Sequence, residues 1–194
     1  MSRGKKRRRL PAESVPESDM SYPAPLDAAA AFKVLVTHHV DFVIIGAMAV
    51  AKHGFVRATK DVDIIPSPEE GNMRKLWEAL VELKARPEVL RDFPERDLPV
   101  ALSLESLTQG ANWSLDTIYG RLDILQYIEG ALENPEDYAR LRANAIASTQ
   151  DFGILQFVGY NDLVDLKTIA GRDQDLIDLR SLEEARHGRG PVAH

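Results

Sequence analysis

The sequence predicts an α/β (α+β) fold, with a mixed β-sheet flanked by helices and a helical C-terminal segment. Three observations lead to this prediction. Strand-length apolar runs alternate with segments of helical periodicity along most of the 194 residues. Two strand-like runs within residues 112–128 follow each other directly, which indicates a hairpin and therefore antiparallel as well as parallel neighbours. Residues 160–188 contain helical patterns alone.

The first helix is expected over residues 28–39, with Asp27 as its cap. The segment DFVIIG, residues 41–46, reads as a strand that ends on glycine. A short helix over 47–54 follows it and closes on a second glycine. The segment DVDIIP, residues 61–66, is the next strand, and its final proline stops it.

Residues 67–87 predict a longer helix, with Ser67 as its cap, a proline in the first turn and acids behind it. Its apolar residues recur at helical spacing and form an expected core face. Prolines interrupt residues 84–110, and no helix or strand is predicted there. The core face consists of Met73, Leu76, Trp77, Leu80 and Leu83.

The hairpin of residues 112–128 should turn at Tyr119–Gly120. A helix over 135–148 has a proline near its start, and FGILQFVG, residues 152–159, is a further strand. Two helices complete the chain. The first covers 160–171, with Asn161 or Asp162 as its cap and Gly171 at its end, and the second covers 173–188 and closes on Gly188.

The length suits one domain with a substantial core, expected over residues 26–190. Residues 1–25 are polar and predict a disordered basic tail. Residues 1–20 hold six Lys or Arg and three acids, which leaves 18 basic and 27 acidic residues elsewhere. The tail is therefore either a solubilising leader or an arm that binds nucleic-acid phosphates.

The composition excludes several classes of protein. The chain has no cysteine, so it forms no disulfide and no thiolate metal site. No apolar run reaches the roughly 18 residues of a membrane-spanning helix, so a membrane partner is not expected. The basic cluster near the start is not followed by the apolar stretch of a secretory signal. A reducing, cytoplasmic setting is the expectation.

Two carboxylates in a strand with an apolar core face are the main functional signal. Asp61 and Asp63 alternate with Val62 and Ile64, so the acids share one face of the strand and the apolar residues face the core. Adjacent like charges are unfavourable unless they are neutralised, and a divalent cation would neutralise them. Asp123, in a second apolar strand, provides a third carboxylate if the two strands are neighbours.

A purely structural explanation of these acids remains open, since acids at strand ends often cap helices or pair with arginine. The turn at Gly46 favours a functional explanation. A strand that ends in glycine and opens a helix exposes backbone N–H groups that can bind an anion. A phosphate site followed by paired carboxylates fits a nucleoside triphosphate with its metal ions, and an in-line phosphoryl or nucleotidyl displacement.

The segment IIGAMAVAKHGFVRATKDVDII, residues 44–65, resembles the signature of the nucleotidyltransferase superfamily that shares the fold of DNA polymerase beta. Its combination of Ala-Val, His-Gly, Arg-x-Thr and Asp-x-Asp is most similar to small bacterial nucleotidyltransferases of the AbiEii type. Residues 162–185, DLVDLKTIAGRDQDLIDLRSLEEA, resemble a second segment of that group. The resemblance spans about residues 28–187.

The resemblance implies a nucleotidyltransferase-like fold and roles for individual residues. Asp61, Asp63 and Asp123 would bind Mg²⁺ or Mn²⁺ and form the catalytic site, with Asp123 helping to activate the acceptor hydroxyl. Lys167 would contact the nucleotide phosphates and also count as catalytic. The nucleotide site would in addition include Gly46, Ala47, Arg57 and Thr59.

Two positions depart from the pattern of the group. Ala47 stands where many members have glycine or serine, so a hydroxyl contact to the triphosphate is missing. Gln174 stands where a lysine often precedes the paired acids.

Several residues have competing explanations. His53 is favoured as a helix-end residue that bonds a carbonyl, and Arg57 either contacts phosphate or pairs with an acid. Without the resemblance, Lys167 reads as an ordinary surface lysine. Three charged residues near the end, Arg172, Asp175 and Asp178, read equally well as a helix-to-helix ion-pair cluster.

The resulting hypothesis is a metal-dependent nucleotidyltransferase that moves a nucleoside monophosphate from an NTP to an acceptor hydroxyl. A toxin-type enzyme acting on tRNA or another RNA bound by the basic tail, with a cognate antitoxin as partner, is one form of it. The alternatives are a small-molecule, antibiotic nucleotidyltransferase and a non-catalytic NTP-binding member of a toxin–antitoxin pair. An acidic body suits a cationic drug, whereas a basic tail suits RNA.

Overall fold

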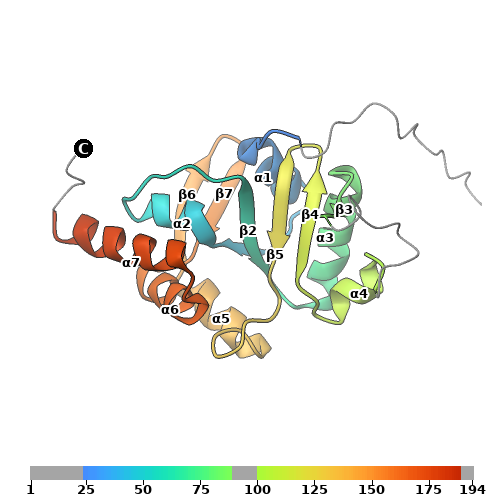
Figure 1. The fold of residues 1–194 in the computed structure, drawn as a ribbon. Coiled ribbons are helices and arrows are strands. Elements are labelled where there is room, and N and C mark those ends of the chain that lie inside the picture. The colour runs from blue at the N-terminus through green and yellow to red at the C-terminus, as the bar shows by residue number, and fades with distance from the viewer. Residues whose placement is uncertain (1–23, 89–99, 189–194) are drawn as a thin grey trace, which may run out of the picture.

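The computed structural model describes residues 24–88 and 100–188, which form one mixed sheet with helices on both faces (Figure 1). The predicted basic tail, residues 1–25, lies outside the described residues except for its last two positions. In chain order the elements are α1 (Ala28–Thr37), β1 (Phe42–Ile44), α2 (Gly46–Lys52), β2 (Asp61–Pro66), α3 (Glu70–Glu82), β3 (Arg86–Pro87), α4 (Leu104–Thr108), β4 (Trp113–Thr117), β5 (Gly120–Ile124), α5 (Pro135–Ala143), β6 (Ile146–Gln150), β7 (Gly153–Phe157), α6 (Tyr160–Ala170) and α7 (Asp173–Arg186).

The sheet has seven strands in the order β3-β4-β5-β2-β1-β7-β6. The pairs β2–β5 and β1–β7 are parallel, and the other neighbours are antiparallel. The predicted mixed sheet is therefore confirmed. Strands β4 and β3 form one end of the sheet, whereas α6 and α7 lie beyond α2 toward the other end (Figure 1). Strand β2 lies between these two regions.

The core is built from the apolar runs that the sequence predicts. Ile44, Val62, Ile64 and Leu122 are fully or almost fully buried. The expected core face of α3 is also present, because Met73, Leu76, Leu80 and Leu83 are buried and Trp77 packs against them. Burial of this apolar area is the main contribution to stability.

Most predicted elements are confirmed, including both sides of the hairpin, β4 and β5. Asp27 caps α1, since its Oδ1 accepts a hydrogen bond of 3.0 Å from the backbone N–H of Ala30. Gly171 ends α6 in the left-handed conformation expected for a C-terminal glycine.

Two predicted helix caps are wrong. Helix α3 begins at Glu70, and its N-cap residue is Glu69, so Ser67 does not cap it. The backbone N–H of Ser67 donates instead to the Asp41 carbonyl, and its own carbonyl accepts from Asn72. Helix α6 begins at Tyr160, and its N-cap residue is Gly159, so neither Asn161 nor Asp162 caps it. The Asp162 carboxylate is engaged by side chains from α5 and from the residue that follows α5, namely Arg140 and Asn144.

The helix predicted over residues 135–148 is too long. Helix α5 ends at Ala143, and Ile146–Gln150 form strand β6, which pairs with β7 from Ile146–Phe157 to Gln150–Gly153. Pairing with the adjacent strand β7, in a tight hairpin, overrides the local helix preference of an alanine-rich segment. Two short elements in the region left unassigned, β3 and α4, also belong to the described structure.

Candidate active site

The register of two parallel strands places three aspartates on one face of the sheet. Asp61 lies opposite Arg121, and Asp63 lies opposite Asp123. Residues in register on neighbouring strands project from the same face, while Val62 and Leu122 between them are buried on the other. Asp61, Asp63 and Asp123 together are called the aspartate site below. Strand periodicity predicted the Asp61–Asp63 pair, and the β2–β5 pairing adds Asp123 to it.

Asp63 is the most strongly perturbed member of the aspartate site. Its pKa is raised from 3.8 to about 6, first by burial and then by the neighbouring charges of Asp61 and Asp123. Arg172 and Lys167 oppose this shift without cancelling it. Asp63 therefore lacks sufficient positive charge around it, which is a feature of groups prepared for a ligand cation or a proton.

The contact between Asp63 and Gly46 explains why glycine begins α2. Gly46 has a φ of +62°, and a Cβ placed on it would overlap Asp63 Oδ2. The backbone N–H of Ile45 donates to the Asp63 carbonyl at 3.0 Å. A side chain at position 46 would displace the Asp63 carboxylate, so the glycine keeps α2 and β2 in close contact.

Thr59 and Asp61 form a separate hydrogen-bonded unit. The Thr59 hydroxyl donates to Asp61 Oδ1 at 2.7 Å, and the same hydroxyl is 3.2 Å from the Asp61 carbonyl. Thr59 therefore contacts the Asp61 carboxylate and fixes its orientation. The role of Thr59 toward a nucleotide stays a prediction.

Asp123 differs from the other two acids because a cation already contacts it. Arg121 Nε donates to Asp123 Oδ1 at 3.1 Å, and Arg121 also pairs with Glu88 at 2.9 Å. Burial raises the pKa of Asp123, and Arg121 reduces that rise without reversing it. Sequence reasoning missed Arg121, although its position two residues before Asp123 in the strand places both side chains on one face.

The donor chemistry of the aspartate site fits Mg²⁺ or Mn²⁺. Both ions prefer oxygen ligands, and Mg²⁺ is commonly held by one or two carboxylates, with water and substrate phosphates completing its coordination. Within residues 24–88 and 100–188, no group of three or more His, Cys, Asp or Glu side chains is arranged so that it could hold a metal ion by itself. The residues therefore fit a metal shared with a substrate better than a closed, all-protein site.

A cavity of about 690 Å³ opens over the aspartate site. Gly46, Ala47 and the three aspartates border it, together with four cations, namely Arg57, Arg121, Lys167 and Arg172. An apolar wall completes it, and this wall includes Trp113, Ile124, Leu125, Ile128, Leu163 and Leu166. A cavity with a charged end and an apolar wall suits a ligand that has both a polyanionic and an apolar or aromatic part.

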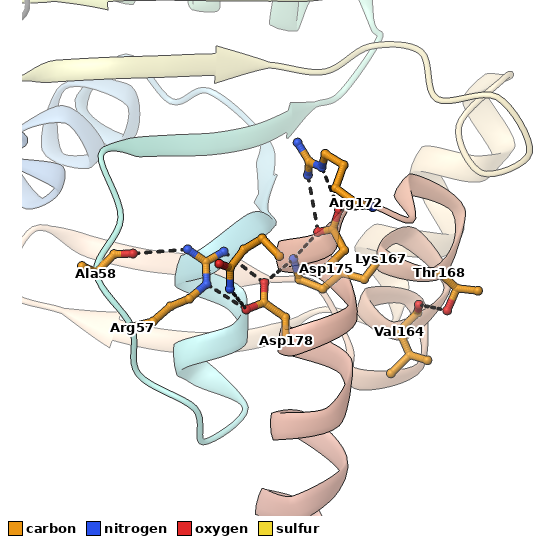
Figure 2. Close-up of polar contacts among 9 residues, drawn as sticks. Arg57, Ala58, Val164, Lys167, Thr168, Arg172, Asp175 and Asp178 are labelled. Atoms are coloured by element: carbon orange, nitrogen blue, oxygen red, sulfur yellow. Dashed lines mark hydrogen bonds and ion pairs between the residues drawn. The ribbon is translucent and has the colours of Figure 1, made fainter. Parts of the chain in front are cut away.

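A buried group of charges lies beside the cavity and is called the ion-pair cluster below (Figure 2). Lys167 Nζ is 2.8 Å from Asp175 Oδ1 and 2.7 Å from Asp178 Oδ2. Arg57 binds Asp178 through Nε at 2.8 Å and Nη2 at 3.0 Å. Arg172 Nε is 2.7 Å from Asp175 Oδ2. The cluster therefore joins α6, α7 and the loop before β2.

The two acids of the ion-pair cluster are fully compensated. Burial opposes the ionisation of Asp178, but hydrogen bonds from Arg57, Lys167 and Gln174 outweigh it and lower the pKa of this carboxyl. The pKa of Asp175 is lowered in the same way, with burial outweighed by Arg172 and Lys167. The ion-pair explanation of these residues holds, and Arg57 pairs with an acid. The phosphate role of Lys167 stays a prediction.

His53 closes α2, as predicted for a helix-end residue. Its Nε2 lies 2.8 Å from the Val158 carbonyl oxygen, and its ring meets Tyr160 edge to face. His53 does not border the cavity over the aspartate site.

The sequence matches no protein-family model and no curated protein. Among solved structures, the chain is similar to the antibiotic-resistance factor ANT(2'')-Ia in solution, with 13% identity, a TM-score of 0.45, and coverage of 84% of this chain and 91% of that chain. For crystalline ANT(2'')-Ia in complex with adenylyl-2''-tobramycin the values are 12%, 0.45, 82% and 92%.

The chain is also similar to an antigenic nucleotidyltransferase-like protein from Paracoccidioides brasiliensis. That pair has 18% identity and a TM-score of 0.43, and the match covers 82% of this chain and 78% of the other. Similarity to nucleotidyltransferases at these values does not define a reaction.

Proposed function

We propose that this protein is a divalent-metal-dependent nucleotidyltransferase. The observation that carries the proposal is the convergence of Asp61, Asp63 and Asp123, from two parallel strands, at one cavity. Asp63 has a raised pKa there because burial and its two acidic neighbours disfavour its charge. Such a group of acids is costly for a protein that does not bind a cation, so its presence supports a catalytic use.

In the proposed reaction, the acceptor hydroxyl oxygen forms a bond to the α-phosphorus of an NTP. The bond between that phosphorus and the bridging oxygen to the β-phosphate breaks, and pyrophosphate leaves with the electron pair. Asp61 and Asp63 would hold Mg²⁺ or Mn²⁺, with Asp123 as a further ligand; when bound, the metal would supply charge neutralisation for the phosphates.

The side chains of the chain itself position the reactants. Asp123 accepts the proton of the acceptor hydroxyl, and Thr59 keeps Asp61 oriented through its 2.7 Å hydrogen bond. The Gly46–Ala47 turn borders the triphosphate, and the apolar wall of the cavity receives the base. Positioning and charge neutralisation then supply most of the rate, without a covalent enzyme intermediate.

The finer assignment rests on sequence motifs. The segments 44–65 and 162–185 support an AbiEii-type, toxin-like enzyme with an RNA acceptor such as tRNA and a cognate antitoxin. Five adjacent cations in the tail, Lys5 to Arg9, support recruitment of that RNA. The absence of cysteine is compatible with the reducing cytoplasm in which such an enzyme would act. None of the described helices is long and apolar enough to cross a bilayer.

A labelling assay tests the proposal. The protein is incubated with each of the four α-labelled NTPs, Mg²⁺ and either total cellular RNA or an aminoglycoside, and the labelled product is identified. Label on RNA is the expected result. Label on the aminoglycoside would support the antibiotic alternative, and NTP binding without any transfer would support the non-catalytic alternative.

Two variants make the assay specific. Asp63→Asn should lower transfer by about a hundredfold or more, because it removes a proposed metal ligand. Asp165→Asn makes the same chemical change at an exposed position of α6 and should transfer as the unmodified protein does. Equal activity of Asp63→Asn and Asp165→Asn would contradict the proposal.

A further inference from the structure

The three cations of the ion-pair cluster, from α6, the start of α7 and the loop before β2, border the cavity, and two of them are already neutralised. Lys167 is only 5% exposed, and Asp175 and Asp178 both contact its ammonium group, at 2.8 and 2.7 Å. Arg57 makes two hydrogen bonds to the fully buried Asp178. Lys167 and Arg57 thus serve as counter-ions for these two acids.

Arg172 is different, because its guanidinium remains largely exposed. Its side chain is 77% exposed, although its Nε is only 2.7 Å from Asp175 Oδ2. Its second contact, from Nη2 to Asp175 Oδ1, is long at 3.4 Å. Among the described residues, Asp175 is the one side chain that accepts hydrogen bonds from this guanidinium. The outer edge of the guanidinium fork is therefore open to the cavity that Arg172 borders.

The charge balance of the ion-pair cluster also indicates that Arg172 carries the uncompensated positive charge. Asp175 and Asp178 balance two of the three cations Arg57, Lys167 and Arg172, which leaves one positive charge. Since Lys167 lies between the two acids and Arg57 is paired with Asp178, the exposed position of this charge is at Arg172. Figure 2 shows Arg172 at the edge of the cluster, where α7 begins. The charges of Asp63 and Asp61 act on its guanidinium, in addition to the hydrogen bond with Asp175.

We propose that Arg172 binds the β- and γ-phosphates of the nucleotide and that Asp175 is its positioning residue. This inference rests on the proposed nucleotidyltransferase function and adds the residue that recognises the pyrophosphate part of the NTP. A guanidinium held through Nε by a carboxylate presents its remaining N–H groups in a plane that matches two phosphate oxygens. Lys167 fixes Asp175 from the buried side and makes no phosphate contact in this arrangement.

The contacts of the ion-pair cluster form a series that leads from Asp178 to Arg172. Asp178 holds Lys167, Lys167 holds Asp175, and Asp175 holds Arg172. Each pair is more exposed than the one before it, so the chain of contacts runs from the core to the cavity. A rigid base of this kind limits the rotamers of Arg172 and reduces the entropy lost when phosphate binds.

Calorimetric titration can separate phosphate recognition from other effects. The protein is titrated, with Mg²⁺ present, with ATP, GTP, CTP and UTP. The tightest NTP, its monophosphate and inorganic pyrophosphate are then compared in the unmodified protein and in Arg172→Gln. We expect the Kd of the NTP and of pyrophosphate to rise about tenfold or more in Arg172→Gln, while the Kd of the monophosphate changes less than about twofold.

Two further variants complete the design. Arg180→Gln removes the same charge from an exposed position of α7 that does not border the cavity, and it should bind all three ligands normally. Asp175→Glu keeps the charge but moves the carboxylate, so it should weaken NTP and pyrophosphate binding and leave the monophosphate unaffected. Melting temperatures of all variants confirm that each protein is folded.

The outcomes are distinct. Equal weakening of the NTP and the monophosphate, or no change in Arg172→Gln, would overturn the assignment of Arg172 and leave the proposed function standing. A protein that binds none of the four NTPs would refute the proposed function and this inference together. A tenfold loss in Arg180→Gln as well would mean that general charge, and not the position of Arg172, controls binding.

Discussion

The aspartate site and the ion-pair cluster are two groups of acids in neighbouring parts of the same molecule. Burial raises the pKa of Asp63, Asp175 and Asp178 alike, but the net pKa shifts of the two groups are opposite. In the ion-pair cluster, cations outweigh burial, and the pKa values of Asp175 and Asp178 fall below their usual range. In the aspartate site, burial and mutual repulsion dominate, and the pKa of Asp63 rises to about 6. Counter-ions, more than depth, separate a structural group of acids from a candidate catalytic one.

This difference teaches how the two groups should respond to change. The ion-pair cluster is complete, so removing one member leaves a buried charge without its partner. The acids of the aspartate site are not fully compensated by cations, so removing one of them relieves repulsion. Such a change should lower activity but not stability. Stability and activity should therefore separate between the two regions.

The largest effect is expected from Lys167→Met, which removes the ammonium group between Asp175 and Asp178 while keeping most of the side-chain volume. Two buried carboxylates would then face each other with one fewer cation. We expect the free energy of unfolding to fall by about 3–5 kcal/mol. Urea unfolding of this variant measures it, and a decrease below about 1 kcal/mol would mean that the cluster is not a unit of stability.

Asp63→Asn should show the opposite combination. Transfer should fall by about a hundredfold or more, while the free energy of unfolding stays the same or rises by up to about 1 kcal/mol. Thermal melts with and without Mg²⁺ provide the measurement. In the unmodified protein Mg²⁺ should raise the melting temperature, and in Asp63→Asn it should do so less. A clearly lower melting temperature of Asp63→Asn without metal would identify these acids as structural.

The pH dependence of stability should differ in sign between the two regions. The folded pKa of Asp63 is about 6 and its usual value is 3.8, so the folded state binds more protons between these values. Stability should therefore rise as the pH falls from about 7 to about 4, by about 2 kcal/mol. The lowered pKa values of Asp175 and Asp178 act in the other direction, and their contribution is lost only at still lower pH.

Urea unfolding at a series of pH values between about 4 and 7 in metal-free buffer tests this expectation, with Asp63→Asn as the control. The increase toward low pH should be absent, or much smaller, in the variant. An equal increase in both proteins would assign it to other carboxyl groups.

The smallest effect is expected from the basic tail, which lies apart from both acidic regions in the sequence. Removal of residues 1–20 should raise the KM for RNA and flatten its salt dependence, while the KM for the NTP stays nearly constant. Each RNA phosphate that the tail no longer neutralises should change the logarithmic salt slope by about 0.7 for a single strand. If the truncated protein labels RNA as well as the full chain at low and moderate salt, the tail is a solubilising leader.

The sequence predicts the aspartate face well because strand periodicity is a local property. Alternation of Asp61, Val62, Asp63 and Ile64 requires no knowledge of distant residues. The same local argument failed at Ile146–Gln150, because those residues become a strand only through pairing with β7. Ser67 failed for a related reason, since contacts with Asp41 and Asn72 determine its place.

The partners of the charged residues could not be predicted from local patterns. Lys167 and Asp178 lie on different helices, and the turn at Gly171 brings them together. Arg57 is even further from Asp178 in the chain, so its choice between phosphate and acid depended on tertiary structure. The hydrophobic pattern determines which face each residue occupies, but not which charge it meets.

The Arg57–Asp178 pair has a consequence for the synthesis of the protein. The two residues are 121 positions apart, and this contact fastens the loop that leads into β2. While a ribosome is still translating α7, that loop lacks its anchor, and Asp178 remains in the exit tunnel after the aspartates have emerged. The candidate site thus reaches its final geometry only after α7 has been synthesised and has left the tunnel, so chains terminated before α7 would retain all three aspartates but not the arrangement that surrounds them.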